Sequence, residues 1–222
     1  MLRRLLKPLA GRGSAGWRLL RSPALRHRVF GDPGDTLLFA LRLDMPRATV
    51  VCLGANEVGD QDPLRPFLET GWRGLLVEPV PYVFRRLQER WGHNPRLLLE
   101  NAAVAAATGT TTFHFVREST DLPRGYDHLG SLSQELLRSH TEIVPELEGR
   151  LISATVPAVT FPDLLTKHRI AAFDLLVMDL EGFDYEVLKQ VDFTRHCPQL
   201  VMYEHAFLSD ADRAAARYRS GA

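Results

Sequence analysis

The feature that most constrains the fold of this chain is an alternation, from residue 48 onward, of short apolar runs with amphipathic stretches. Such alternation is typical of βαβ units, in which a helix connects two neighbouring parallel strands. It therefore predicts an α/β fold with a largely parallel sheet, and we interpret residues 110–140 as an insertion or cap. We expect strands at residues 48–54, 73–79, 96–104, 110–116, 173–182 and 198–207, and helices at residues 63–71, 81–92, 130–140, 161–170 and 183–191.

The amino-acid composition limits the kinds of ligand and partner that this chain is expected to bind. The 222 residues are 45% hydrophobic and 24% charged, which is ordinary for one soluble domain with a sizeable core. Basic and acidic residues number 27 each, so no overall field attracts nucleic acid, and we expect a small-molecule ligand. The two cysteines, Cys52 and Cys197, lie far apart in apolar surroundings, which favours reduced thiols and a cytoplasmic location. We expect no transmembrane segment.

The first residues differ from the rest, because eight Lys or Arg residues and no acid precede Asp32. We divide the chain into a basic N-terminal extension, residues 1–35, and one domain, residues 36–222. The extension lacks the continuous apolar run of a secretory signal. A solvated extension is the favoured interpretation, and contact with a surface or partner and a cleaved leader are the alternatives.

Several polar and glycine residues fall where the predicted strands end. Ligands of open α/β sheets bind at the carboxyl ends of parallel strands, so these residues are the candidate site. They are Gly54, Ala55, Asn56, Glu78, Asn101, Asp179, Glu181, Glu204 and His205.

The first of these groups bears on the cofactor. The spacing Gly54-x-Asn56-x-x-Gly59 resembles the dinucleotide fingerprint, and Glu78 follows at the distance of the acid that binds a ribose. The middle glycine, which lets backbone approach a pyrophosphate, is replaced by Asn56. This favours an adenosine ligand without phosphates, such as S-adenosylmethionine. A nicotinamide site and a purely structural glycine turn remain as alternatives.

The last two groups are candidates for catalysis. Asp179 and Glu181 are two residues apart, so in an extended strand both would face the pocket; alternatively, Asp179 caps the following helix. His205 is either a base or a structural histidine. Asp179, Glu181 and Glu204 could bind Mg²⁺, but their spacing does not require it, and we predict no metal. For His128 and His140, in the cap, we favour a surface role over substrate contact.

The blocks "LGANEVGDQDPLRPFLETGWRGLLVEPVPYVFRRL", "ENAAV", "GSLSQELLRSH", "FDLLVMDLEGFDYEVL" and "MYEH" resemble, in order and spacing, those of the FkbM-type methyltransferase family. The resemblance covers about residues 48–208. It implies a class I methyltransferase (Rossmann-like) fold, with a mostly parallel sheet flanked by helices. It also implies methyl transfer from S-adenosylmethionine to a hydroxyl of a sugar or secondary metabolite. By position, it places Gly54, Ala55 and Asn56 under the methionine part of the cofactor, Glu78 on the ribose, and Asn101 and Ala102 near the adenine or sulfonium.

The sequence thus predicts an S-adenosylmethionine-dependent O-methyltransferase with Asp179, Glu181 and His205 as catalytic candidates. A nicotinamide-dependent oxidoreductase and a non-catalytic protein of the same fold are the alternatives. After Tyr203 there is no room for the antiparallel strand pair that usually completes such a sheet. We therefore expect either a truncated chain or a partner, such as a second copy, that covers residues 199–203.

Overall fold

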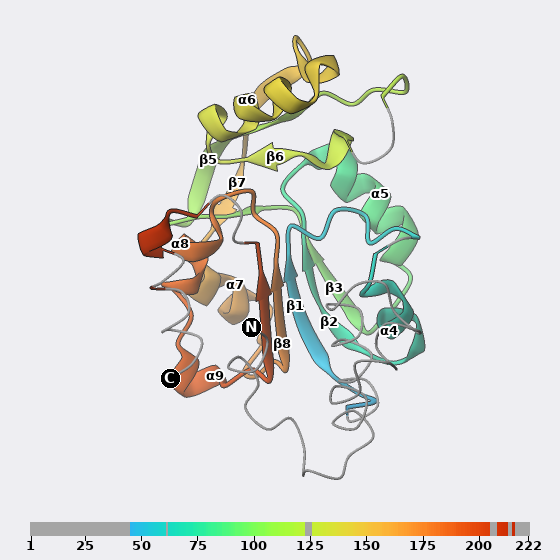
Figure 1. Ribbon diagram of the computed structural model, residues 1–222. Helices are drawn as coiled ribbons and strands as arrows, with labels where there is room; N and C mark the ends of the chain where they lie inside the picture. Colours follow the sequence, from blue (N-terminus) through green and yellow to red (C-terminus); the bar gives the residue numbers. More distant parts are fainter. Residues whose placement is uncertain (1–44, 61, 123–125, 205–207, 213–214, 216–222) are drawn as a thin grey trace, which may run out of the picture.

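The computed structural model describes residues 45–60, 62–122, 126–204, 208–212 and 215 (Figure 1). The predicted extension, residues 1–35, lies outside the described residues, and so does the catalytic candidate His205. The division into an extension and a domain therefore stays a prediction.

The main sheet has five strands in the order β3-β2-β1-β8-β9, and every neighbouring pair is parallel. This confirms the predicted α/β fold with a parallel sheet. The order reverses direction at β1, the kind of position at which open α/β sheets bind ligands. The strands are β1 (Thr49–Leu53), β2 (Arg73–Val77), β3 (Leu97–Glu100), β8 (Leu175–Met178) and β9 (Leu200–Tyr203).

Helices cover both faces of this sheet, which explains why its strands are near-continuous apolar runs. Along β1, Val50 and Cys52 pack into a core with α4 and α5, whereas Val51 and Leu53 pack into a second core with α7 and α8. Figure 1 shows these two layers on opposite sides of the sheet. The helices are α4 (Arg65–Thr70), α5 (Pro81–Trp91), α7 (Phe161–Lys167), α8 (Asp184–Leu188) and α9 (Phe193–His196).

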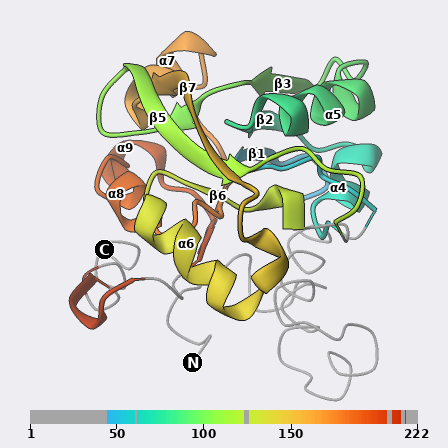
Figure 2. The same ribbon diagram turned by 90° about the horizontal axis from the view of Figure 1, so that it is seen from above.

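A second sheet, in the order β4-β7-β5-β6, includes the predicted cap. Its central pair, β5 and β7, is antiparallel over eight residue pairs, and β4 lies parallel to β7. Figure 2 shows α6 and β6 lying over the main sheet. The strands are β4 (Ala103–Val104), β5 (Gly109–Val116), β6 (Gly130–Ser131) and β7 (Leu151–Val159), and α6 spans Gln134–Ile143.

Two sequence predictions need correction here. The single strand predicted at residues 96–104 is divided at Asn101, because the chain leaves the main sheet after β3 and enters the second sheet as β4. Strand β7 was not predicted, since most of its first half is exposed and it contains Pro157, a residue that is unusual within strands. Helix α6 begins at Gln134, with Ser133 as its N-cap, while Ser131 lies in β6.

Strand β9 forms one edge of the main sheet, and no further strand follows it among the described residues. Pairing of this edge with a second copy stays a prediction. None of the described helices is long and apolar enough to cross a membrane.

Candidate active site

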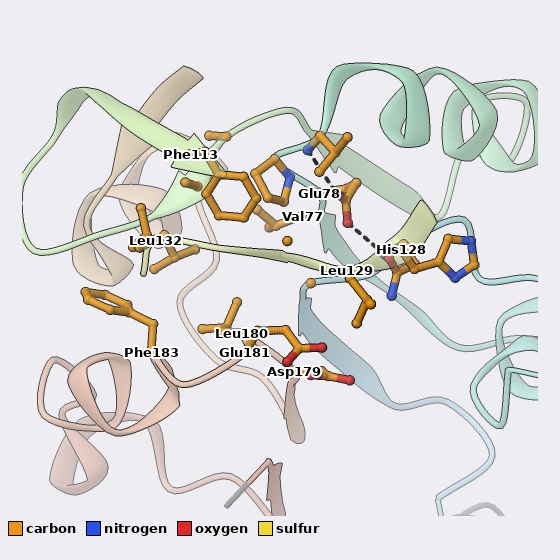
Figure 3. A pocket seen from close by; sticks show the side chains of 18 residues that line it. Val77, Glu78, Phe113, His128, Leu129, Leu132, Asp179, Leu180, Glu181 and Phe183 are labelled. Carbon is orange, nitrogen blue, oxygen red and sulfur yellow. Dashed lines mark hydrogen bonds between the residues drawn. The ribbon is translucent and has the colours of Figure 1, made fainter. Parts of the chain in front are cut away.

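A cavity of about 230 Å³ opens where the carboxyl ends of β1, β2 and β8 meet the second sheet (Figure 3). Its floor includes Gly54 and Asn56 after β1 and Glu78 after β2. Asp179 and Glu181, after β8, lie on another side. Five of the nine predicted site residues thus line one cavity, and residues 128–130 and Leu132 of the second sheet layer close it from above.

The turn after β1 brings backbone close to the end of β8. Gly54 has φ +73°, and the N–H groups of Gly54 and Ala55 both donate to the carbonyl oxygen of Val77, at 3.0 and 2.9 Å. A Cβ atom at Gly54 would lie 2.0 Å from the carbonyl oxygen of Asp179. A side chain is therefore excluded at this position. Ala55 points into the core instead of the cavity, while Asn56 lines the cavity.

Glu78 is almost completely buried at the end of β2, with 3% of its surface exposed. One carboxylate oxygen accepts from the N–H of Asn56 at 3.0 Å and the other from the N–H of Val80 at 2.8 Å (Figure 3). Burial raises the pKa of Glu78 to about 7 against the opposing effect of these two hydrogen bonds. A carboxylate has about four acceptor positions, so two remain for hydroxyl groups of a ligand.

Asn101 and Ala102, which follow β3, have different positions. The side-chain amide of Asn101 donates to the carbonyl oxygens of Glu78, at 2.8 Å, and Pro79, at 3.2 Å. It holds the segment that carries Glu78 and does not line the cavity, whereas Ala102 does.

Asp179 and Glu181 come together for a reason other than the predicted one. Strand β8 ends at Met178, and Glu181 has φ +47°, so the segment is a turn and the strand alternation assumed for the pair is wrong. The alternative that Asp179 caps α8 is also wrong, because the cap residue is Phe183 and no side chain caps it. The turn nevertheless places carboxyl oxygens of Asp179, Glu181 and Glu204 within 4.8 Å of one another.

A family comparison decides which class of protein this arrangement belongs to. The model of the methyltransferase FkbM domain matches residues 53–218, which contain every residue of the site. The chain belongs to the FkbM methyltransferase family. No curated protein and no solved structure matches it significantly.

The acidic cluster of this FkbM domain, which we define as Asp179, Glu181, Asp184 and Glu204, is electrostatically unusual. Burial, followed by the neighbouring acids, raises the pKa of Glu181 to about 8 and that of Glu204 to about 7. Among the described residues, one buried carboxyl oxygen of each of these two glutamates has no hydrogen-bond partner. Acids at this spacing share protons or a cation, and the raised pKa values describe the first of these states.

Asp184 was missed as a site residue, although it ends the motif D-x-E-G-x-D. Its carboxyl group is fully buried and accepts from the N–H of Leu180 at 3.1 Å and from the N–H of Glu204 at 3.3 Å. Burial raises its pKa to about 6. Asp184 therefore ties the turn after β8 to the end of β9, and this tie sets Glu181 beside Glu204.

The cap reaches the acidic cluster through His140 and Ser131. The Nε2 atom of His140 lies 3.7 Å from a carboxyl oxygen of Glu181, and only 13% of the histidine side chain is exposed. The hydroxyl of Ser131 donates to the carbonyl oxygen of Glu181 at 2.9 Å. Burial lowers the pKa of His140. The surface role favoured for His140 is thus wrong, whereas His128 lines the cavity mouth, 3.7 Å from Glu57.

The raised pKa values of Glu78, Glu181, Asp184 and Glu204 make stability depend on pH. The folded state binds these protons more tightly than the unfolded chain, so the free energy of unfolding falls as pH rises towards about 8. The lowered pKa of His140 acts in the opposite direction, but only below about pH 6.5. Between pH 6.5 and 8.5 we expect a loss of about 2 kcal/mol, or about 4–8 °C in melting temperature.

Thermal unfolding followed by circular dichroism at the two pH values measures this difference. The double variant Glu181→Gln, Glu204→Gln should lose most of it. If the wild-type melting temperature did not decrease from pH 6.5 to pH 8.5, the raised pKa values assigned to these acids would be contradicted.

Proposed function

We propose that this FkbM-family chain transfers a methyl group from S-adenosylmethionine to a hydroxyl of a small molecule, such as a sugar or secondary metabolite. The observation that carries the proposal is the cavity itself. In it Glu78, a buried acid at the position expected to bind a ribose, faces the acidic cluster across the ends of β1, β2 and β8. The strand order β3-β2-β1-β8-β9 supports assignment to the class I methyltransferase fold.

The residues present fit an adenosine-type cofactor. Gly54 lines the cavity with backbone alone, because its close approach to Asp179 leaves no room for a Cβ. Glu78 retains acceptor positions for two ribose hydroxyls. The aliphatic and aromatic wall of Val80, Ala102 and Phe113 suits the flat face of a base. When bound, S-adenosylmethionine would supply an electrophilic methyl group.

The chain's own part in the reaction is to orient the acceptor and to take its proton. Alignment of two reactants in one site can account for about 7–11 kcal/mol of a barrier. Glu181 has a pKa near the working pH, which is the property of an efficient proton acceptor, and such a group typically adds about 10²–10⁴-fold. Asp179 accepts the N–H of Glu181 and so holds the same turn. His205 remains a candidate base.

Calorimetric titration of the full chain separates the three functions that the sequence left open. Binding of S-adenosylhomocysteine supports the methyltransferase, and binding of NAD(H) instead supports the oxidoreductase. Binding of neither indicates a non-catalytic protein. Release of S-adenosylhomocysteine over a panel of sugars, glycosides and hydroxylated metabolites then identifies the acceptor class.

Replacing Glu78 by alanine tests the cofactor assignment. We expect S-adenosylhomocysteine to bind about 10- to 100-fold more weakly, because hydrogen bonds worth about 1.5–3 kcal/mol in total are lost. The main-chain N–H groups of Asn56 and Val80 would then face the cavity, where water can replace the carboxylate. Calorimetry measures the affinity, with the exposed Glu89→Ala on α5 as the matched control. Equal affinity in both variants would show that Glu78 does not bind the ribose.

A further inference from the structure

A second cavity, of about 500 Å³, lies between α7, the segment that follows α7, and α9. Both helices are on the same face of the main sheet (Figure 1). Its two arginines, Arg169 and Arg195, precede β8 and β9 in the chain, whereas the acids of the candidate active site follow the same two strands. The charged part of this cavity is therefore at the opposite end of these strands from the acidic cluster.

The lining of this cavity carries more positive than negative charge. Within the described part of the chain, neither Arg169 nor Arg195 uses its guanidinium in an ion pair or hydrogen bond. The acid in the lining is Asp192, and its carboxylate already caps α9 by accepting from the N–H groups of Thr194 and Arg195. The guanidinium group of arginine matches the geometry of phosphate and carboxylate groups. Two arginines on one cavity therefore suit a ligand with such a group.

The backbone at Arg169 strengthens this inference. Arg169 has φ +54°, directly beyond the end of α7, and its N–H donates to Thr166 while that of Ile170 donates to Leu165. Glycine is usual at such a position, because any other side chain costs about 1–2 kcal/mol there. The fold alone would be better served by glycine, so the presence of an arginine that lines a cavity calls for a functional reason.

Part of the remaining lining is apolar, alongside the polar Thr166 and Gln190 and the exposed Pro162 and Ala171. Phe161, Leu165 and Ile170 line the cavity, and the ring of Phe161 packs edge-on against Phe173, with centroids 6.0 Å apart. The ring of His196 stacks on the same Phe173 at 5.3 Å, and its buried Nδ1 atom has no hydrogen-bond partner among the described residues. An apolar group can therefore contact these side chains while its charged end meets the two arginines, which are exposed.

We propose that this cavity is a second ligand site, which binds a small organic anion. The phosphate or carboxylate of the ligand is held by Arg169 and Arg195, and its apolar body lies against Phe161, Leu165 and Ile170. The ligand is distinct from the methyl acceptor, because its charged group is bound at the other end of β8 and β9 from Glu181.

Calorimetric titration of the full chain with phenyl phosphate, benzoate, phenol and inorganic phosphate tests the proposal. We expect at least one of the two aromatic anions to bind saturably and at least about 10-fold more tightly than phenol, since charge-assisted hydrogen bonds are worth about 1.5–3 kcal/mol each. Inorganic phosphate should bind more weakly than phenyl phosphate. If neither aromatic anion binds more tightly than phenol, or if inorganic phosphate binds as tightly as phenyl phosphate, the proposal is overturned.

Two variants locate the site. Arg169→Gly should reduce binding of the aromatic anion at least about 10-fold while the melting temperature stays equal or rises, because glycine suits this backbone. Arg195→Gln should weaken binding similarly, and Arg138→Gln, an exposed arginine on α6, should not. Wild-type affinity in both Arg169→Gly and Arg195→Gln would overturn the assignment. S-adenosylhomocysteine binding should be unchanged in all three, so the outcome is independent of the proposed methyl transfer.

Discussion

Replacing Gly54 by valine is expected to abolish S-adenosylhomocysteine binding and to lower the free energy of unfolding by about 2–6 kcal/mol. The loss has two sources. Gly54 has φ +73°, which a β-branched residue strongly disfavours, and the new Cβ would lie 2.0 Å from the carbonyl oxygen of Asp179. The turn after β1 and the end of β8 must then separate, which moves Glu78 and the acidic cluster apart.

Gly149 provides a matched control, because its φ is +72° and nothing lies within 4 Å of its Cβ position. Gly149→Val should cost only the backbone strain, about 1–3 kcal/mol, and should leave cofactor binding unchanged. Urea unfolding and calorimetry on both variants separate strain from collision. A Gly54→Val variant that folds normally and still binds would refute the role of this close approach.

Replacing Glu181 by glutamine, or Asp179 by asparagine, is expected to reduce turnover at least about 10²-fold in one of the two variants. Each change keeps the volume of the side chain and removes its ability to take a proton. Ser131 holds the Glu181 turn through a main-chain carbonyl, so the turn should survive Glu181→Gln. Affinity for S-adenosylhomocysteine should therefore stay near normal.

Initial rates and calorimetry on the same preparations test this combination of effects. Glu186→Gln is the matched control, because Glu186 is an exposed acid of α8 outside the acidic cluster. Full activity in both Asp179→Asn and Glu181→Gln would leave the pair with a structural role only. His205 would then be the leading candidate for the base.

Local sequence determined the elements of the main sheet. The apolar runs that became β1, β2, β8 and β9 are bounded by glycine, proline or charged residues, and α5 covers residues 81–91 where 81–92 was predicted. Because these strands are parallel, their carboxyl ends meet at one edge of the sheet. This geometry alone predicted that Gly54, Glu78 and Asp179 would share a site, and all three line the cavity.

Tertiary structure alone decided the parts of the site that depend on contacts distant in sequence. Strand β7 lacks a regular alternation of apolar and polar residues, and it is a strand because β5 pairs with it. Asn101 lies where the chain leaves the main sheet, and its side-chain amide donates to the carbonyl oxygen of Glu78. Glu181 points into the cluster from a left-handed turn, which no spacing of residues could reveal. Asp184 belongs to the cluster through hydrogen bonds from the N–H groups of Leu180 and Glu204, and His140 lies beside Glu181 because α6 packs over this end of the sheet. A local pattern records which side chains are apolar, but the partner of a buried polar group is fixed only when the chain has folded.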